Sequence, residues 1–486
     1  MLFNSLEFIV FLPIVFILYW YVFGRSLKFQ NIFIVVVSYI FYGWWDWRFL
    51  FLIAFTTGCS YFNALAIRQN LDKGKYNVAK TFSICNVAIN LAILGLFKYY
   101  NFFAESLREL LERLNYQLDY PTLNIILPVG ISFYTFQALS YTIDVYKRKM
   151  EPTRDPVAFF AFVSFFPQLV AGPIERATNL LPQFKKERHF DYNNAVDGCR
   201  QMLWGFFKKV VIADNCAYYA NIAFDNHNEV GSASLLLGAI FFTFQIYGDF
   251  SGYSSIAIGC AKLFGIKLQA NFRVPYFSRD IAEFWKRWHI SLNKWFVDYV
   301  YIPLGGSRVS KLKVVRNIFV VFLLSGLWHG ANWTYVGWGL YHACLFIPLI
   351  LCNRNHKHQG GFPDNNIFPR VGDLCNMLIT FVLVMMGWII FRATSMTQAV
   401  EYIVRMFSME RQTSVFVSFR ASLWLIEVIM FSLCVEWWNR SSEHEFKKVV
   451  SNKYIRTFVY FILTASIFYS YMLSIEEDST FIYFQF

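Results

Sequence analysis

His329 lies at the end of an unbroken apolar run and is the residue best placed to do chemistry. The run 318–328 before it carries no charge, and Ser325 is its one polar side chain. An ionisable group inside an apolar segment is costly to keep, so it indicates a functional site. Imidazole is also well suited to proton transfer near neutral pH. The structural alternative is a buried imidazole that only bonds a backbone carbonyl of a neighbouring helix.

Two further side chains could do chemistry. His289 lies among indole and basic groups in the stretch WKRWHISL, where an interfacial helix would explain Lys286 and Arg287 but not the imidazole. Asp249, in YGDFSGYSS, is a carboxylate in an apolar segment and should be paired or hydrogen-bonded. It could orient a histidine or hold a helix break, and a structural role is favoured for it alone.

No other pattern predicts a metal, nucleotide or hydride site. The nine cysteines contain no CxxC pair and are interpreted as small core hydrophobes, so we expect no disulfide framework and no zinc site. The sequence has neither a P-loop nor a Rossmann glycine pattern, which argues against nucleotide hydrolysis and hydride transfer. We therefore expect no bound metal or cofactor.

The composition predicts a protein of the lipid bilayer. Hydrophobic residues make up 56% of the 486 residues and charged residues 16%, whereas soluble domains average about 45–50% and about 25%. The chain is therefore predicted to be an all-α polytopic membrane protein. Its net charge of +12 comes from lysine and arginine in short loops between apolar runs. Such loops indicate retention in the cytoplasm and argue against nucleic-acid binding.

The hydropathy pattern also predicts the elements that position these side chains. Apolar spans or segments are expected at 2–23, 31–45, 49–65, 82–99, 125–146, 195–221, 235–264, 316–328, 333–352, 378–391, 423–435 and 458–473. The long segment 235–264 is expected to be interrupted at 248–252. A turn within or at the edge of the membrane is expected around Pro167 and 172–173, and 280–301 is expected to be interfacial or re-entrant.

The segment that ends at His329 should carry its imidazole deep into the membrane. A straight helix from Arg316 would place it about 20 Å inward, past the middle of a hydrocarbon core about 30 Å thick. A group there could be approached from both faces through a tunnel. Gly326 and Gly330 have the GxxxG spacing that lets membrane helices approach closely.

Lysine and arginine are concentrated in the loops that follow the first, third and fifth spans. The positive-inside rule then places the N-terminus outside the cytoplasm. The basic segment 439–456 is expected in the cytoplasm, which places the acidic C-terminal tail outside as well.

Four stretches together resemble the membrane-bound O-acyltransferase family, in its bacterial polysaccharide-modifying branch. They are FFPQLVAGPIER (165–176), QIYGDFSGYSSIAIG (245–259), NFRVPYFSRDIAEFWKRWHISLNKWFVDYVYIPLGGSR (271–308) and GLWHGANWTYVGWGLYH (326–342). Long motifs in this order are far more specific than any single one. One departure is Ser255, where the family pattern leads us to expect an acidic residue.

The resemblance implies an acyltransferase in which His329 is the intramembrane catalytic histidine and His289 a second functional one. It implies a ring of transmembrane and re-entrant helices around a central funnel, in the bacterial cytoplasmic membrane. One integrated membrane domain is then expected, with N-terminal transmembrane helices at 1–155, a catalytic core at 156–352 and C-terminal transmembrane helices at 353–486.

The expected donor is acetyl-CoA or another short acyl thioester, carried on CoA or on an acyl carrier protein. Its phosphates are expected to meet basic side chains, assigned by charge and neighbourhood only. These are Arg273, Arg279, Lys286 and Arg287. His329 would act as general base, and His289 would orient the thioester or stabilise the oxyanion. Asn332 could donate to that oxyanion, and Asp249 would support the site.

The expected acceptor is a hydroxyl at the outer face, on a polysaccharide or on an esterase-like extracytoplasmic partner that relays the acyl group. Alginate, another exopolysaccharide, peptidoglycan and teichoic acid all remain open, the last with a D-alanyl carrier protein as donor. Two other classes also stay open. A transporter or flippase would show inverted repeats with paired broken helices, which we do not find, and a scaffold for partner enzymes would need no chemistry of its own.

Overall fold

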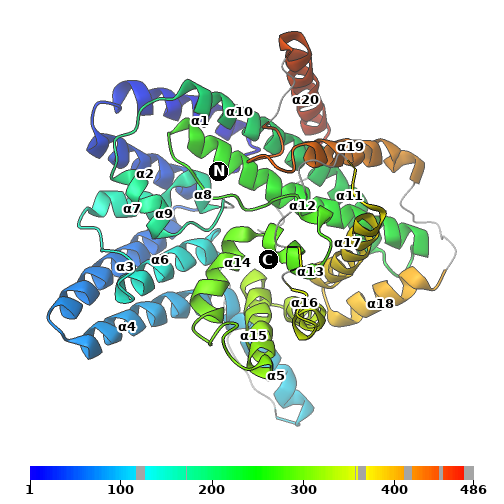
Figure 1. Cartoon of the computed structure of the whole chain (residues 1–486), viewed down its shortest axis with the longest axis horizontal. Coiled ribbons are helices and arrows are strands. Elements are labelled where there is room, and N and C mark those ends of the chain that lie inside the picture. Colours follow the sequence, from blue (N-terminus) through cyan, green and yellow to red (C-terminus); the bar gives the residue numbers. More distant parts are fainter. Residues whose placement is uncertain are drawn as a thin grey trace. The chain divides into compact units, whose positions relative to one another are not determined.

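The computed structural model describes residues 1–116, 126–170, 172–355, 357–358, 368–409, 419–447 and 452–474. These residues form helices and connecting segments without a strand, so the prediction of an all-α protein is confirmed (Figure 1). Seven helical segments among them are long and apolar enough to cross a membrane. They are Arg48–Asp72, Tyr76–Arg113, Ser232–Leu263, Lys311–His329, Trp333–Leu351, Val371–Arg392 and Lys453–Leu473. The acidic tail lies outside the described residues.

The chain divides into two compact units, and the first comprises Met1–Ala195 and Cys260–Gln269. Its helices are α1 (Leu6–Ile17), α2 (Leu27–Gly43), α3 (Arg48–Asp72), α4 (Tyr76–Leu94), α5 (Tyr100–Arg113), α6 (Ile131–Tyr146), α7 (Pro156–Ser164), α8 (Phe166–Leu169) and α9 (Ala177–Phe184). Short π-helices extend α1 to Val22 and join α4 to α5. The chain does turn around Pro167, because α7 ends before it, α8 is a single turn, and 173–176 is not helical. The place of this turn at the membrane stays a prediction.

Polar side chains join three helices of this unit. The Asn86 side-chain amide on α4 donates to Thr142 on α6 at 2.9 Å and accepts from Ser60 on α3 at 3.1 Å. All three side chains are buried. Such hydrogen bonds hold helices together where lipid supplies no hydrophobic driving force.

The second unit comprises Val196–Gly259 and Ala270–Phe486. Its helices are α10 (Tyr192–Phe206), which begins in the first unit, α11 (Asp214–Asp225), α12 (Ser232–Leu263), α13 (Ile281–Arg287), α14 (Ile290–Phe296), α15 (Lys311–His329), α16 (Trp333–Leu351), α17 (Val371–Arg392), α18 (Met396–Phe407), α19 (Phe419–Trp438) and α20 (Lys453–Ser474). The π-helix η3 (Phe207–Ala213) links α10 to α11. The helix expected at 195–221 is therefore present, with a π-helical middle.

The interruption expected at 248–252 is wrong, because α12 is one helix of 32 residues. The glycines in this stretch serve close packing between helices and do not break the helix. A Cβ atom at Gly252 would lie 2.8 Å from the Gly205 carbonyl oxygen, and one at Gly205 would lie 2.7 Å from the Gly252 carbonyl oxygen. These glycines therefore let α10 and α12 approach closely, as small residues do in membrane helix pairs.

The segment 280–301 does not span, as predicted, and forms two short helices followed by one π-helical turn. The Asp280 carboxylate caps α13 by accepting from the Glu283 backbone N–H at 2.7 Å. His289 separates α13 from α14 and has φ 44° and ψ 53°. This left-handed conformation costs a non-glycine residue about 1–3 kcal/mol, and such strain clusters at functional sites.

Helices α15 and α16 pack in close contact, as the GxxxG spacing predicted (Figure 1). A Cβ atom at Gly326 would lie 2.2 Å from the Tyr335 carbonyl oxygen, and one at Gly339 would lie 2.4 Å from the Phe322 carbonyl oxygen. The pair is antiparallel, since the earlier residue of α15 meets the later residue of α16. This close packing fixes the end of α15, where His329 lies.

We expect Gly326→Ala to lower the stability of the folded protein by about 1–3 kcal/mol, because an added methyl group overpacks a tight contact. Thermal unfolding of the purified protein in detergent measures the effect. Gly58→Ala on α3 is the matched control, since nothing lies within 4 Å of a Cβ atom there. Equal melting temperatures for both variants and the wild type would contradict the prediction.

Candidate active site

The two histidines singled out from the sequence lie together in the second unit. The centres of the His289 and His329 rings are 6.3 Å apart, and the ring planes are inclined at 59°. His329 is the last residue of α15, and His289 immediately precedes α14. Their side chains are buried, with exposed fractions of 4% for His329 and 1% for His289. The fold thus brings close together two imidazoles that are distant in the sequence.

Aromatic side chains enclose this histidine pair. The His329 ring centre lies 5.2 Å from that of Trp338 and 5.5 Å from that of Phe391. The His289 ring meets Phe250 of α12 edge-on at 4.6 Å, and Trp328 lies beside both imidazoles. This apolar wall keeps bulk water from the rings and strengthens polar interactions among them.

The two ring nitrogens of His289 differ in their hydrogen bonding. Its Nδ1 lies 3.0 Å from the Oδ1 atom of Asn271. Its Nε2 is buried and has no hydrogen-bond partner among the described residues. A buried polar atom without a partner is rare in proteins and indicates a place for a missing group. Such a group here could be a reacting hydroxyl.

Asn271 also belongs to the candidate site, although its residue type did not indicate this in the sequence. Its amide also contacts Ser254 of α12 at 3.2 Å and Ser291 of α14 at 2.8 Å. Its backbone carbonyl accepts from the Ile290 N–H at 2.9 Å. The one signal in the sequence was its place in the stretch NFRVPYF, which carries part of the family resemblance.

Asp249 faces a lysine. The Lys209 ammonium lies 2.7 Å from the Asp249 carboxylate and 2.8 Å from the Asp214 carboxylate, and all three side chains are buried. This ion pair joins α12 to the π-helix η3. Asp249 neighbours the histidine pair through the next residue, Phe250, which packs on His289.

Asn332 caps α16. Its Oδ1 accepts from the Thr334 backbone N–H at 3.0 Å, and its Nδ2 donates to the Thr394 carbonyl at 3.1 Å. Both ends of the amide are therefore engaged in holding the start of α16 and the segment after α17. Asn332 follows His329 closely in the chain, so its cap helps fix the turn that carries the histidine.

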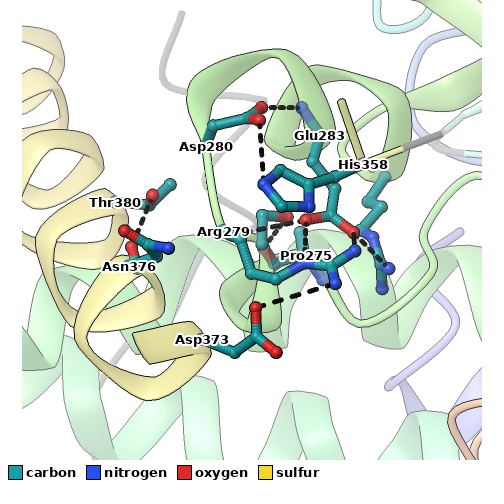
Figure 2. A network of polar contacts seen from close by, with 10 residues as sticks. Pro275, Arg279, Asp280, Glu283, His358, Asp373, Asn376 and Thr380 are labelled. Atoms are coloured by element: carbon teal, nitrogen blue, oxygen red, sulfur yellow. Dashed lines mark hydrogen bonds and ion pairs between the residues drawn. The ribbon is translucent and has the colours of Figure 1, made fainter. Parts of the chain in front are cut away.

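The basic residues proposed for donor binding fall into two groups. Figure 2 shows Arg279 beside Glu283, with contacts of 3.0 and 3.1 Å, and the same carboxylate accepts from Arg287 at 2.7 Å. Burial would raise the pKa of Glu283, but the hydrogen bonds from Arg279 and the charge of Arg287 hold that pKa below its usual value. The cluster of Arg279, Glu283 and Arg287 thus keeps a net positive charge.

Two nearby acidic residues temper that charge. Arg279 also lies 3.9 Å from Asp373 of α17, and His358 lies 3.8 Å from Asp280 (Figure 2). The other two candidate donor-binding residues, Arg273 and Lys286, are exposed. Lys286 contacts only a backbone carbonyl among the described residues, that of Asn355, at 3.4 Å. Arg273 and Lys286 are therefore the more accessible cations.

The described residues contain no group of three or more histidine, cysteine, aspartate or glutamate side chains that could hold a metal ion. The second unit does hold two buried imidazoles, one of them in contact with an amide oxygen. That combination suits proton transfer inside a membrane.

Comparison with known proteins agrees with this class. Residues 152–391 match the model of the MBOAT, or membrane-bound O-acyltransferase, family. The chain is 40% identical over 410 residues to the protein named "Probable alginate O-acetylase AlgI" of Pseudomonas aeruginosa. This match covers 84% of this chain and 75% of that protein. It is 35% identical over 431 residues to the peptidoglycan O-acetyltransferase of Helicobacter pylori, covering 82% of this chain and 79% of the relative.

A more distant relative is the teichoic acid D-alanyltransferase of Bacillus subtilis. It is 30% identical over 290 residues, which cover 57% of this chain and 71% of that protein. The fold and the matches define a multi-pass membrane enzyme that transfers acyl groups to oxygen. The chain belongs to the membrane-bound O-acyltransferase family, and the resemblance seen in its motifs is confirmed.

Proposed function

We propose that this enzyme moves an acetyl group from a cytoplasmic thioester, acetyl-CoA, to hydroxyl groups of an extracytoplasmic polysaccharide. The names of the relatives support an acetyl group and a glycan acceptor, and the family match supports acyl transfer at the histidine pair. The relatives that share 35–40% identity over more than four fifths of this chain are named for O-acetylation of alginate or peptidoglycan. The family match also contains both histidines of the buried pair. The proposed location is the bacterial cytoplasmic membrane, with both termini outside.

The histidine pair carries the proposed mechanism. An imidazole of the pair takes the proton of the acceptor hydroxyl, and the hydroxyl oxygen attacks the thioester carbonyl. The carbon–sulfur bond then breaks, and the thiolate of CoA leaves with a proton from the imidazolium. Positioned proton transfer of this kind contributes about 10²–10⁴-fold to the rate. Because the rings are buried, the proposed reaction also needs a passage for thioester and hydroxyl, as the family resemblance implies.

Recognition of the donor is proposed for the basic side chains around α13. Arg273 and Lys286 are exposed and could meet the phosphates of CoA directly. Arg279 and Arg287 are paired with Glu283, and Arg279 also lies near Asp373, so they would contribute less to phosphate binding than the two exposed cations. The acetyl group would reach the polysaccharide directly or through an extracytoplasmic esterase-like partner.

D-alanyl transfer to teichoic acid from a carrier protein is the second candidate. The match to a teichoic acid D-alanyltransferase favours it, but that match covers only 57% of this chain. A carrier protein would dock on the membrane surface rather than present the phosphates of CoA. The two donors can therefore be told apart with one purified protein.

We expect the purified protein in lipid nanodiscs to release CoA from acetyl-CoA when a polysaccharide acceptor is added, and to ignore a D-alanyl carrier protein. Mass spectrometry of envelope glycans should show ester-linked acetyl groups that disappear when the gene is deleted. They should return with the wild-type gene but not with a His289→Ala, His329→Ala double variant. Glycans of unchanged acetyl content would contradict acetyl transfer, and full rescue by the double variant would leave only a transport or scaffold role.

A further inference from the structure

Asn271 makes one hydrogen bond that decides the chemistry of a catalytic candidate. Its Oδ1 atom faces three groups at once, which are the Nδ1 of His289 at 3.0 Å, the hydroxyl of Ser291 at 2.8 Å and the backbone N–H of Ser291 at 3.4 Å. Its Nδ2 atom donates to the Ser254 hydroxyl at 3.2 Å. The amide therefore joins α12, the His289 turn and the first turn of α14.

The orientation of this amide follows from its partners. The oxygen and nitrogen of an asparagine side chain are told apart by the hydrogen bonds they make. A backbone N–H can only donate, so the amide atom that faces the Ser291 N–H is the oxygen. An amide oxygen can only accept, and the ring atom opposite it must carry a hydrogen. His289 is therefore protonated on Nδ1.

We propose that Asn271 is a positioning residue that holds His289 in the Nδ1–H tautomer, so that its Nε2 is the atom that accepts the proton of the acceptor hydroxyl. This inference rests on the proposed function for its substrate, but the tautomer itself does not. This tautomer does not fit the oxyanion-stabilising role that the sequence led us to expect for His289. A neutral ring with its hydrogen on Nδ1 presents a lone pair at Nε2, so His289 cannot donate to an oxyanion from that atom. His329 then takes the thioester-facing role.

The backbone around His289 supports the same reading. The left-handed conformation of His289 turns the chain so that its own Nδ1, the Ile290 N–H and Ser291 all reach Asn271. Strain of this kind persists only where the surroundings hold it in place. Meanwhile Nε2, on the other side of the ring, is buried and has no hydrogen-bond partner among the described residues. One side of the ring is thus fixed, and the other side is left for a substrate.

In the proposed step, Nε2 of His289 takes a proton from the acceptor and later returns it to the leaving group. The O–H bond of the acceptor breaks, its proton moves to Nε2, and the new carbon–oxygen bond forms at the thioester carbonyl. The imidazolium that results has both nitrogens protonated, and Asn271 still accepts from Nδ1–H. Nε2 then returns its proton to the departing thiolate, which restores the starting tautomer. The amide holds the ring through both halves of the reaction, as the orienting group does in other histidine-based sites.

The charges around His289 set the expected pH response. The titratable group that faces it is His329 of α15, at 6.3 Å between ring centres. On the other neighbouring elements, Asp249 of α12 is paired with Lys209, and Arg287 of α13 is paired with Glu283. A new carboxylate at position 271 would lie directly against Nδ1. It would favour the imidazolium, so that the ring loses its proton only at higher pH.

The tautomer is tested first, and without any assay of activity. The full-length protein, with its eight histidines labelled with ¹⁵N, is reconstituted in lipid, and its ring nitrogen shifts are recorded. The His289 signals are identified by their loss in a His289→Gln variant. We expect a protonated Nδ1 and an unprotonated Nε2 near neutral pH, and a mixture of tautomers in Asn271→Leu. A protonated Nε2 in the wild-type protein would overturn the proposal.

The kinetic test uses two substitutions at the same position. Asn271→Leu should lower kcat by about 10²-fold with little change in KM for the donor, because it removes orientation and not binding. Asn271→Asp keeps the accepting oxygen, so it should restore most of the rate. Its pH profile should lose activity on the acid side about 1–3 pH units higher than the wild-type profile.

Asn90→Leu on α4 is the matched control. Asn90 is also a buried asparagine, and its amide donates to the Asn86 carbonyl at 2.9 Å in the first unit. Its rate per folded molecule should match the wild type. An unmoved acid limb in Asn271→Asp, or a loss in Asn271→Leu that only follows the folded fraction, would overturn the base assignment. If the ¹⁵N result holds while no acetyl donor or acceptor gives turnover, the proposed function fails and the tautomer stands.

Discussion

Replacing His289 or His329 with glutamine should lower acyl transfer by about 10²–10⁴-fold while the protein stays folded. Glutamine fills similar space and keeps hydrogen-bonding groups, but it cannot take up a proton at neutral pH, as proposed for His289. At position 329 it also removes the imidazole that is proposed to face the thioester. The two rings lie 6.3 Å apart in one buried cluster, so they should act on the same reacting atoms. Release of CoA by purified variants, normalised to the folded fraction, measures the effect.

The double variant His289→Gln, His329→Gln separates joint from independent action. Groups that serve one step show strongly non-additive losses, so the double variant should be scarcely slower than the worse single variant. His227→Gln is the control, because His227 lies in a different part of the second unit, beside Glu401 at 3.4 Å. Near-normal turnover in either single variant at the pair would remove the corresponding histidine from the mechanism.

Lys209→Met should destabilise the protein by about 3–5 kcal/mol, because it removes the cation from a buried ion pair. The Lys209 ammonium lies within 2.8 Å of both the Asp214 and the Asp249 carboxylates, and all three side chains are buried. The substitution leaves two buried negative charges close together. Denaturant unfolding of the purified protein in detergent, followed by tryptophan fluorescence, measures the loss.

Lys447→Met is the matched control for this prediction. Lys447 also contacts two carboxylates, those of Asp197 and Glu443, but 40% of its side chain is exposed. Exposed ion pairs contribute little, so this variant should lose less than about 1 kcal/mol. Similar losses for the two lysine variants would show that burial does not decide the strength of the Lys209 cluster.

The membrane class and most helices followed from the sequence, because both depend on local properties. An apolar stretch long enough to cross the bilayer must be helical there, since every backbone polar group needs a partner within the segment. The helix α15 therefore agrees with the segment expected to end near His329. The glycines at 248 and 252 could not be interpreted in the same way. A glycine breaks a helix or allows close packing depending on what lies opposite, and Gly205 lies opposite Gly252.

For the candidate site, too, some features could be predicted from the sequence and others could not. His329 and His289 could be found from the sequence, because an imidazole in an apolar setting is unusual wherever it occurs. Their proximity, the contact between Asn271 and His289, and the pairing of Asp249 with Lys209 appeared only in the structure. The basic residues near 279–287 also changed meaning, since Glu283 engages two of them.

By itself, the sequence determined that this protein is a helical membrane protein, and that His289 and His329 are its candidate catalytic histidines. The tertiary structure decided which ring nitrogen of His289 is held by Asn271 and which has no hydrogen-bond partner among the described residues. The physical reason is that some properties depend on neighbouring residues in the chain and others on contacts between distant segments. Transfer of a segment into lipid depends on the residues of that segment alone, whereas a hydrogen bond from His289 to Asn271 depends on how separate segments pack.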